Sequence, residues 1–313
     1  MASGQERVLR RRIRSVQSTK KITRAMELIA ASRIVKAQQR VAAARPYSEQ
    51  ITEVIRQLAA SGAGLEHPLL QPRDEIKNVG FIAITADRGL AGAYNASIIR
   101  TVERAVAERR THGAGYSLVL AGKKADSYFR WRGYNVDYSG TGFSEQPHYE
   151  DACGLADVVI EKYEKGEIDE VQLVYTRFLS MGSQRVVSRK LLPLDTGAIA
   201  DRSDAEGPVA AYEFEPEPKE ILERLLPQYV EARVFAALLE AAASEQAARQ
   251  RAMKAATDNA EDLIKNLSVG ANKLRQAGIT TEIMEIVGGA EALRQASAVH
   301  HSDTFQEMEQ QPS

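Results

Sequence analysis

The sequence predicts two long helices that pack on each other as an antiparallel coiled coil, with an α/β domain inserted between them. Three observations support this fold class. Residues 5–58 contain one proline and no glycine, so helix breakers are nearly absent there. Between residues 78 and 195, apolar strand-like segments alternate with helical segments. From residue 228 to residue 311 the chain again contains no proline.

The first helix is predicted over residues 5–58 because its apolar residues recur at helical spacing. Pro46 marks a position where a bend is expected, since proline removes a backbone hydrogen bond. Glycines and prolines between residues 62 and 72 then end the helix. A stripe of small and apolar residues on this helix is expected to face the C-terminal helix: Ile22, Ala25, Met26, Ile29, Ala30 and Ile34.

The middle region reads as βαβ units, which predict a mostly parallel, Rossmann-like sheet. Strands are expected where apolar and β-branched residues cluster, and helices where the apolar spacing lengthens to three or four residues. The predicted strands are 79–87, 116–122, 135–140, 170–180 and 183–195, and the predicted helices are 95–110, 123–133 and 149–166.

The C-terminal region is predicted to form one helix from about residue 219 to about residue 293. Alanine dominates residues 236–248, which permits close approach of a partner helix. Neither long helix can bury its apolar stripe alone, so they are expected to pair. The predicted division is a coiled-coil shaft (1–58 and 212–293), an α/β domain (76–195), a polar linker (196–211) and a polar, disordered tail (294–313).

The charge of the chain is unevenly distributed. The net charge is −1, but residues 1–60 carry thirteen Lys or Arg and only four Glu. A basic surface of this kind favours an acidic partner. The only cysteine, Cys153, excludes an internal disulfide and fits a reducing cytosol. No apolar run is long enough to span a membrane, and the N-terminus lacks the apolar core of a signal peptide.

Candidate catalytic and cofactor sites are weak. The loop at residues 85–95 follows a strand and precedes a helix, where phosphates bind in doubly wound folds, but its glycines do not form G-x-G-x-x-G. A tight turn with a local Asp87–Arg88 ion pair is the favoured interpretation. The AGKK segment at 121–124 lacks the Ser or Thr of a phosphate-binding loop and reads as a solvated helix start.

No metal site, cofactor site or catalytic residue is therefore expected. His148, His300 and His301 are too scattered to ligate a metal, and Cys153 reads as a buried structural thiol. Two other classes of protein remain open from composition alone. One is an α/β enzyme with helical arms. The other is a basic adaptor for nucleic acid, although no aromatic residue interleaves the basic segment for base stacking.

Four segments give the chain a specific resemblance to a known family. They are KITRAMELIAASRIVKAQ (21–38), TADRGLAGAYN (85–95), residues 225–264 and NKLRQAGITTEIMEIVGGAEAL (272–293). In this order, over residues 1–293, the sequence resembles the gamma subunits of F-type ATP synthases, particularly actinobacterial ones. The resemblance implies a central rotor stalk whose coiled coil turns inside a ring of alpha and beta subunits. ATP synthesis and hydrolysis would occur on beta, with no catalysis and no cofactor on this chain.

The resemblance also implies which residues contact other subunits. Met26 matches the turn that faces beta, and the basic residues around it would meet acidic loops of beta. The rotor–stator contact candidates are Lys20, Lys21, Arg24, Met26, Arg33, Arg249, Gln276, Thr280, Glu282 and Glu285. The candidates for the foot, beside epsilon and the c ring, are Tyr212, Glu213, Phe214 and Glu215.

The implied partners are the alpha and beta subunits of the catalytic head, the epsilon subunit and the c-subunit ring. No nucleic acid and no direct membrane span are expected. The implied location is the cytoplasmic face of the bacterial plasma membrane, as a peripheral part of the complex that couples proton flow to ATP synthesis. Ala91 stands where many relatives have cysteine, and the tail at 294–313 extends past the usual end of the family.

Overall fold

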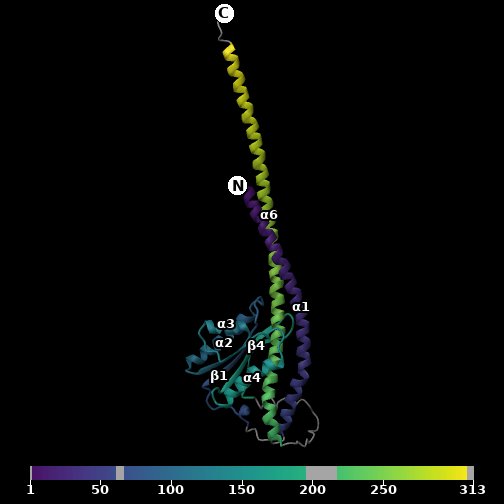
Figure 1. Cartoon of the computed structure of the whole chain (residues 1–313), viewed down its shortest axis with the longest axis vertical. Helices are drawn as coiled ribbons and strands as arrows, with labels where there is room; N and C mark the ends of the chain where they lie inside the picture. The colour runs from purple at the N-terminus through teal and green to yellow at the C-terminus, as the bar shows by residue number, and fades with distance from the viewer. Residues whose placement is uncertain (1, 61–66, 195–216, 309–313) are drawn as a thin grey trace. The chain divides into compact units, whose positions relative to one another are not determined.

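A computed structural model describes residues 2–60, 67–194 and 217–308 of the chain (Figure 1). The chain divides into two compact units, one made of residues 1–24 and 255–313 and the other of Ala25–Lys254. Two long helices, α1 (Ala2–Ala60) and α6 (Pro218–Met308), contribute to both units. None of the described helices combines the length and the apolar character that crossing a membrane requires.

The larger unit contains a five-stranded sheet in the order β3-β2-β1-β4-β5. All neighbouring strands are parallel except β4 and β5, which are antiparallel. A short turn at residues 179–183 joins β4 to β5, and so short a connection cannot make a parallel crossover. The strands are β1 (Asn78–Ile84), β2 (Gly115–Ala121), β3 (Tyr138–Gly140), β4 (Glu170–Phe178) and β5 (Gln184–Leu192).

The elements between the strands match the predicted alternation. The short helix η1 (Pro68–Leu70) precedes β1, and α2 (Tyr94–Thr111) joins β1 to β2. Helix α3 (Lys123–Trp131) leads to β3, and α4 (Tyr149–Glu164) leads to β4. The fold class is confirmed: two long helices pack together beside an inserted α/β sheet of mixed direction.

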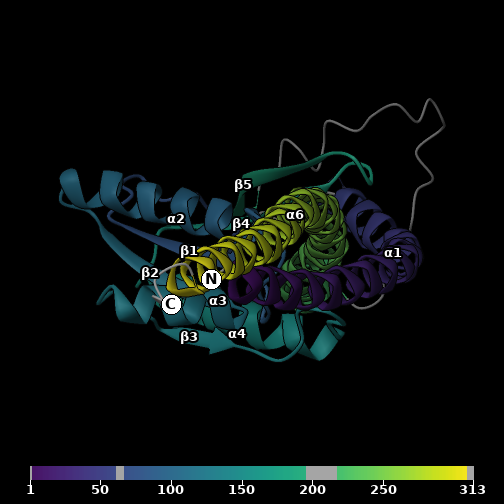
Figure 2. The same ribbon diagram turned by 90° about the horizontal axis from the view of Figure 1, so that it is seen from above.

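The sheet is covered on both faces, which explains why its central strands are almost continuously apolar. On one face, Phe81 of β1 packs with residues of α2 and α3, such as Val102 and Phe129. On the other face, Ile82 packs with α4 and with parts of α1 and α6, such as Leu238. Figure 2 shows α2 and α4 on opposite sides of the strands. The α/β domain and the long helices of this unit thus share one core.

Within the larger unit, α1 and α6 lie side by side, and both pack next to the sheet (Figures 1 and 2). Ile51, Ile55 and Leu58 of α1 enter the same core as Leu226 and Val230 of α6. The alanine-rich part of α6 is buried almost throughout residues 237–247. Small side chains there let α6 approach the sheet and α1 closely. Pro46 lies inside α1 without ending it.

In the smaller unit, the N-terminal part of α1 runs antiparallel to the C-terminal part of α6. The Thr257 hydroxyl donates a 2.8 Å hydrogen bond to the Thr23 hydroxyl, and the Lys20 ammonium lies 3.0 Å from the Glu261 carboxylate. Gly270 packs closely against Leu9. A Cβ added at Gly270 would lie 3.6 Å from the Leu9 side chain. The pairing therefore combines small residues with polar contacts.

The predicted apolar stripe of α1 is only partly buried. Ala30 and Ile34 are buried, but Ile22 and Ile29 are 61% and 53% exposed. The buried positions instead follow Thr23, Glu27, Ala30, Ile34 and Ala37 at helical spacing. Polar residues occupy part of this face, so counting apolar residues alone selected a face rotated away from it.

The C-terminal helix is longer than predicted. Helix α6 continues to Met308, past residue 293, where the predicted helix ends and the disordered tail begins. After Pro227 no proline occurs until Pro312, and Gly288 and Gly289 lower helix propensity without ending the helix. Residues 309–313, and the linker predicted for 196–211, lie outside the described residues.

Candidate functional site

The loop that follows β1 is fixed by the side chain of Asp87. Its carboxylate accepts hydrogen bonds from the backbone amides of Lys123 (3.0 Å), Gly142 (2.9 Å) and Ser144 (3.2 Å). The expected Asp87–Arg88 ion pair is wrong for the described chain, because Arg88 pairs with Glu145 at 3.5 Å. The backbone amides outcompete the neighbouring guanidinium because they converge on the carboxylate from two other segments. Asp87 therefore acts as a structural clamp.

These hydrogen bonds change the acidity of Asp87. Burial alone would raise the pKa of this carboxyl, but the amides of Gly142, Ser144 and Lys123 outweigh it and hold the pKa below its ordinary 3.8. A carboxyl whose folded-state pKa is depressed stabilises the fold above its unfolded-state pKa. That contribution is lost as the pH falls through the folded-state pKa.

We therefore expect an acid-dependent contribution from Asp87 to stability. Asp87→Asn should lower the free energy of unfolding by about 1 kcal/mol at pH 7, because an amide is a weaker acceptor than a carboxylate. As the pH falls below 3.8 and through the lower folded-state pKa, the parent should lose this advantage and the two proteins should converge. Urea unfolding at pH 7 and pH 3 measures both values. A difference that is equal at the two pH values would contradict the assignment.

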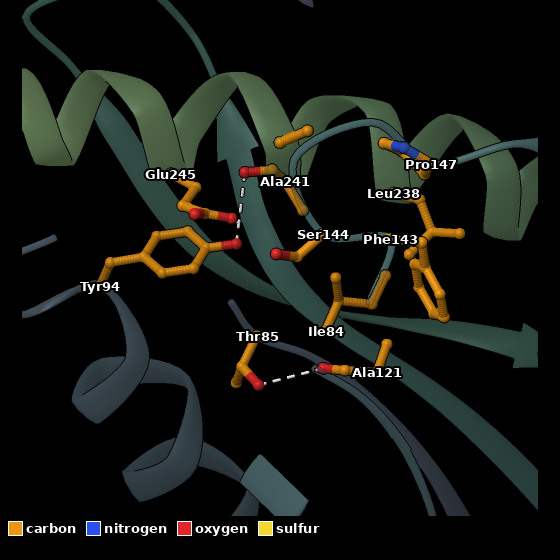
Figure 3. Close-up of a pocket in the computed structure, with 11 residues that line it drawn as sticks. Ile84, Thr85, Tyr94, Ala121, Phe143, Ser144, Pro147, Leu238, Ala241 and Glu245 are labelled. Atoms are coloured by element: carbon orange, nitrogen blue, oxygen red, sulfur yellow. Dashed lines mark hydrogen bonds between the residues drawn. The ribbon is translucent and has the colours of Figure 1, made fainter. Parts of the chain in front are cut away.

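The crevice over the carboxyl ends of β1 and β2 is filled by α6 (Figure 3). Ile84 and Thr85 at the end of β1, Tyr94 of α2 and Glu245 of α6 surround a cavity of about 10 Å³. That volume holds at most one water molecule. The Tyr94 hydroxyl donates to the carbonyl of Ala241 at 3.2 Å, which joins α2 to α6 across the crevice. A dinucleotide cannot enter at this point.

A buried ion pair anchors α6 against this loop. The Arg249 guanidinium lies 2.6 Å from the Glu245 carboxylate, and the two side chains are only 7% and 1% exposed. Arg249 also donates to the carbonyl of Gly89 at 3.3 Å. Burial raises the pKa of Glu245, and the charge of Arg249 opposes that rise. Arg249, a rotor–stator contact candidate, is therefore packed inside its own chain.

The basic candidates on α1 differ in their exposure and in their partners within the chain. Lys21 and Arg24 are exposed, and Lys20 pairs with Glu261. The Arg33 guanidinium lies 2.5 Å from the Glu145 carboxylate, so it is already neutralised within the chain. Met26 is half-buried. Exposed pairs such as these contribute little to stability, so a partner could exchange them at low cost.

The structure adds apolar candidates that the sequence analysis missed. On α1, Leu28, Ile29 and Val35 are 58%, 53% and 51% exposed and lie on the face away from Ala30 and Ile34. In the loop after β1, Leu90 is 61% exposed and has a φ of 65°, a conformation that L-residues other than Gly rarely adopt. Neither burial nor backbone angle is readable from the sequence. Exposed apolar side chains of this kind often mark a protein contact.

The rotor–stator contact candidates near the C-terminus lie on an exposed part of α6. Gln276, Thr280, Glu282 and Glu285 are all exposed, and the Thr280 hydroxyl donates to the Gln276 carbonyl at 3.0 Å. Large apolar residues accompany them over the same turns. Their exposed fractions are 50% for Ile279, 55% for Ile283, 68% for Met284, 72% for Ile286 and 59% for Val287. The foot candidates Tyr212, Glu213, Phe214 and Glu215 lie outside the described residues.

Within the described residues, no three His, Cys, Asp or Glu side chains gather as they would to hold a metal ion. Cys153 is only partly buried, and burial together with Glu231 raises the pKa of its thiol to about 11. Such a thiol is almost entirely protonated near neutral pH and a poor nucleophile. His148 precedes α4, where its backbone amide donates to the Asp151 carboxylate at 2.7 Å.

Comparison with known proteins gives a consistent result. A family model described as ATP synthase matches residues 5–293. The ATP synthase gamma chain of Frankia casuarinae is 52% identical over 295 residues, which cover 93% of this chain and 98% of that protein. The ATP synthase gamma chain of Mycolicibacterium smegmatis is 48% identical, covering 92% of this chain and 97% of its own.

Solved structures agree on the fold. A chain of the central stalk and c-ring structure of the Tetrahymena thermophila mitochondrial ATP synthase is 25% identical, with a TM-score of 0.57 over 75% of this chain and 99% of that chain. A chain of the Euglena gracilis mitochondrial ATP synthase is 19% identical, with a TM-score of 0.64 over 94% of this chain and 96% of its own. The second likeness supports the fold alone.

Proposed function

From the premise that this chain belongs to the gamma chains of ATP synthase, which are non-catalytic components of the central stalk, we propose how its surfaces couple rotation to nucleotide turnover. The chain turns with the c-subunit ring while the C-terminal part of α6 turns inside a ring of alpha and beta subunits. Each beta subunit then meets a different side of the shaft. ATP is made or hydrolysed on beta.

We extend the proposal to the remaining partners and the location. The epsilon subunit and the c ring contact the foot around Tyr212–Glu215, and the complex holds the chain at the cytoplasmic face of a bacterial plasma membrane. The charge distribution supports the orientation toward the head, because residues 1–60 carry the excess of Lys and Arg and would meet acidic loops of beta.

The exposed apolar face of α6 carries the proposal. Ile283, Met284 and Ile286 are each more than half exposed, although apolar side chains of this size are ordinarily buried. No described residue covers these side chains, so another protein is expected to pack against them. Gln276 lies beside Ile283 on the helix surface, and Glu285 is exposed on the same turns, so the shaft also offers weak, exchangeable polar contacts. A shaft that turns needs contacts of this kind, because a strong contact in one orientation would trap it.

Torque reaches chemistry through differential binding. A ligand shifts an equilibrium only by its difference in affinity for two states, and an asymmetric shaft presents such a difference to each beta subunit. On α1, Leu28, Ile29 and Val35 are exposed together with basic residues such as Lys21, whereas Ala30 and Ile34 on another side are buried. The shaft surface is therefore unequal around its axis.

The function can be tested by assembly. The chain is co-expressed with the alpha and beta subunits of a close actinobacterial relative, and the purified complex is assayed for magnesium-dependent ATP hydrolysis. We expect the complex to contain fewer copies of this chain than of beta. We also expect most of the ATP hydrolysis to be lost when the chain is omitted. Failure to copurify, together with salt-dependent retention of the isolated chain on DNA, would favour the adaptor class instead.

A charge at Met26 should impair coupling. Met26→Lys places a new cation next to the acidic loops of beta, and an exposed ion pair of about 1 kcal/mol biases the shaft roughly fivefold toward one orientation. We expect fewer protons pumped per ATP hydrolysed in reconstituted vesicles. The matched control is Met181→Lys, on the β4–β5 turn, where Met181 is 45% exposed. Equal ratios in parent, control and Met26→Lys would refute the role of Met26.

A further inference from the structure

We propose that an open pocket at the N-terminus of α2 binds the phosphate group of a hydroxylated phosphate monoester. The pocket has a volume of about 430 Å³ and lies on the α2 side of the sheet. It is distinct from the filled crevice over β1 and β2. Its walls come from the loop before α2, the ends of β4 and β5, and α6, with Ser97, Thr176, Gln184 and Arg251 among them.

The sheet order places this pocket where open α/β sheets bind ligands. Strand β1 lies between β2 and β4, and the chain leaves β1 through α2 toward β2 on one side while β4 lies on the other. The order of strands therefore reverses between β1 and β4. The crevice outside the carboxyl ends of strands at such a reversal is the usual ligand site of this architecture.

The N-terminus of α2 carries no acidic side chain that would offset its partial positive charge. Helix α2 has eighteen residues, its N-cap is Ala93 without a side-chain cap, and its first turn contains no acidic residue. The Tyr94 amide already donates to the Ala91 carbonyl at 3.2 Å and the Ser97 amide to the Ala93 carbonyl at 2.9 Å, so the helix N-terminus acts mainly through its partial positive charge, which favours an anion there. None of the described residues lining the pocket is Asp or Glu.

A buried hydroxyl inside the pocket lacks a partner. Thr176 is 5% exposed, and its Oγ1 makes no hydrogen bond within the described chain. Thr176 follows Val174 by two positions on β4, so its side chain lies on the α2 face of the sheet, where the pocket is. Leaving a buried polar group unpaired is unfavourable, and a phosphate oxygen would satisfy this hydroxyl.

Arg251 supplies charge at the rim. Its Nη1 donates to the carbonyls of Met181 and Gly182 at 3.2 Å each, which holds the guanidinium in place. The remaining donors on Nε and Nη2 are available to an oxyanion, and a planar guanidinium suits a phosphate. Arg251 is exposed, so a ligand can reach it from solvent.

The rest of the pocket indicates the kind of molecule that carries the phosphate. The Gln184 Oε1 is buried without a donor, while its Nε2 donates to the Ser180 carbonyl at 2.6 Å. A hydroxyl group on the ligand could donate a hydrogen bond to this unpaired acceptor. Ala93, Ala248 and Ala252 provide a small apolar wall. A sugar phosphate or the sugar-phosphate part of a nucleotide combines these groups and fits the volume. When bound, it would bridge α2, β4 and α6.

The proposal is tested on the full-length chain with ribose 5-phosphate, inorganic phosphate and ribose as probes. Binding is followed by the amide resonances of Gly92 and Ser97 in ¹⁵N–¹H spectra. We expect saturable shifts with ribose 5-phosphate, weaker binding of inorganic phosphate and no binding of ribose. Arg251→Gln should weaken ribose 5-phosphate binding about tenfold, because a charge-assisted hydrogen bond is lost.

Two further variants control the test. Arg100→Gln removes an exposed arginine from α2 outside the pocket and should leave affinity unchanged. Thr176→Val keeps the shape of the side chain, removes the unpaired hydroxyl and should weaken binding severalfold. The absence of saturable shifts with both phosphates would overturn the proposal. Equal affinity for ribose and ribose 5-phosphate would overturn the phosphate assignment, as would equal effects of Arg251→Gln and Arg100→Gln.

Discussion

Arg249→Met should lower the free energy of unfolding by about 3–5 kcal/mol at neutral pH. Glu245 is 1% exposed and lies 2.6 Å from the Arg249 guanidinium, so removing the cation leaves a buried carboxylate without its counter-ion. The Gly89 carbonyl loses a hydrogen bond as well. The affected contacts join α6 to the loop after β1, and urea unfolding followed by circular dichroism measures the loss.

The pH dependence and two control variants identify the cause. Burial already raises the pKa of Glu245, and losing Arg249 should raise it further, so the deficit of Arg249→Met should shrink as the pH falls and Glu245 becomes protonated. Combining Arg249→Met with Glu245→Gln should recover much of the stability, because no buried charge remains.

Arg224→Met provides the matched exposed pair. Arg224 also pairs with a glutamate four residues earlier, Glu220, at 3.3 Å, but the two side chains are 81% and 52% exposed. Its removal should cost no more than about 0.5 kcal/mol. If Arg249→Met costs as little as Arg224→Met, the buried pair does not anchor α6.

Gly122→Ala should be the second strongly destabilising substitution, by roughly 2–5 kcal/mol. Gly122 precedes α3 with a φ of 96°, and a Cβ at this position would lie 2.2 Å from the Thr85 carbonyl oxygen. The obstacle is backbone, which cannot rotate aside. The Thr85 amide also donates to the Ala121 carbonyl at 2.8 Å, so a shift there would disturb the pairing of β1 with β2.

Gly113→Ala separates backbone strain from collision. Gly113 has a φ of 74°, but nothing lies within 4 Å of the position a Cβ would take. It should cost only about 1–2 kcal/mol, the strain of a left-handed conformation. Thermal unfolding of both variants gives the comparison. Equal losses would mean that the close approach of Gly122 to Thr85 contributes nothing.

Much of the architecture was readable from the sequence because it depends on local periodicity. Strand-like runs, helical spacing and the positions of Gly and Pro place α2, α3, α4 and the five strands close to their observed bounds. The antiparallel direction of β5 was also within reach, since the turn after β4 spans only residues 179–183. The quoted motifs identified the family because they are long and unusual.

Whether an individual side chain is paired within the protein depends on contacts between residues that are far apart in the sequence. Arg33 pairs with Glu145, 112 positions away, and Arg249 bonds Gly89, 160 positions away. Sequence spacing carries no information about such contacts. It therefore could not tell that these two arginines are engaged within the chain.

The sequence by itself determined that α1 and α6 are helices, that a βαβ sheet separates them and that the N-terminal segment is basic. Only the tertiary structure decided which face of α1 is buried, because apolar residues occur on more than one face and Thr23 and Glu27 share the buried one. It also decided that α6 fills the crevice over β1 and β2 and leaves the pocket beside α2 open. Helical period fixes which residues share a face, but only the packed partner selects the face.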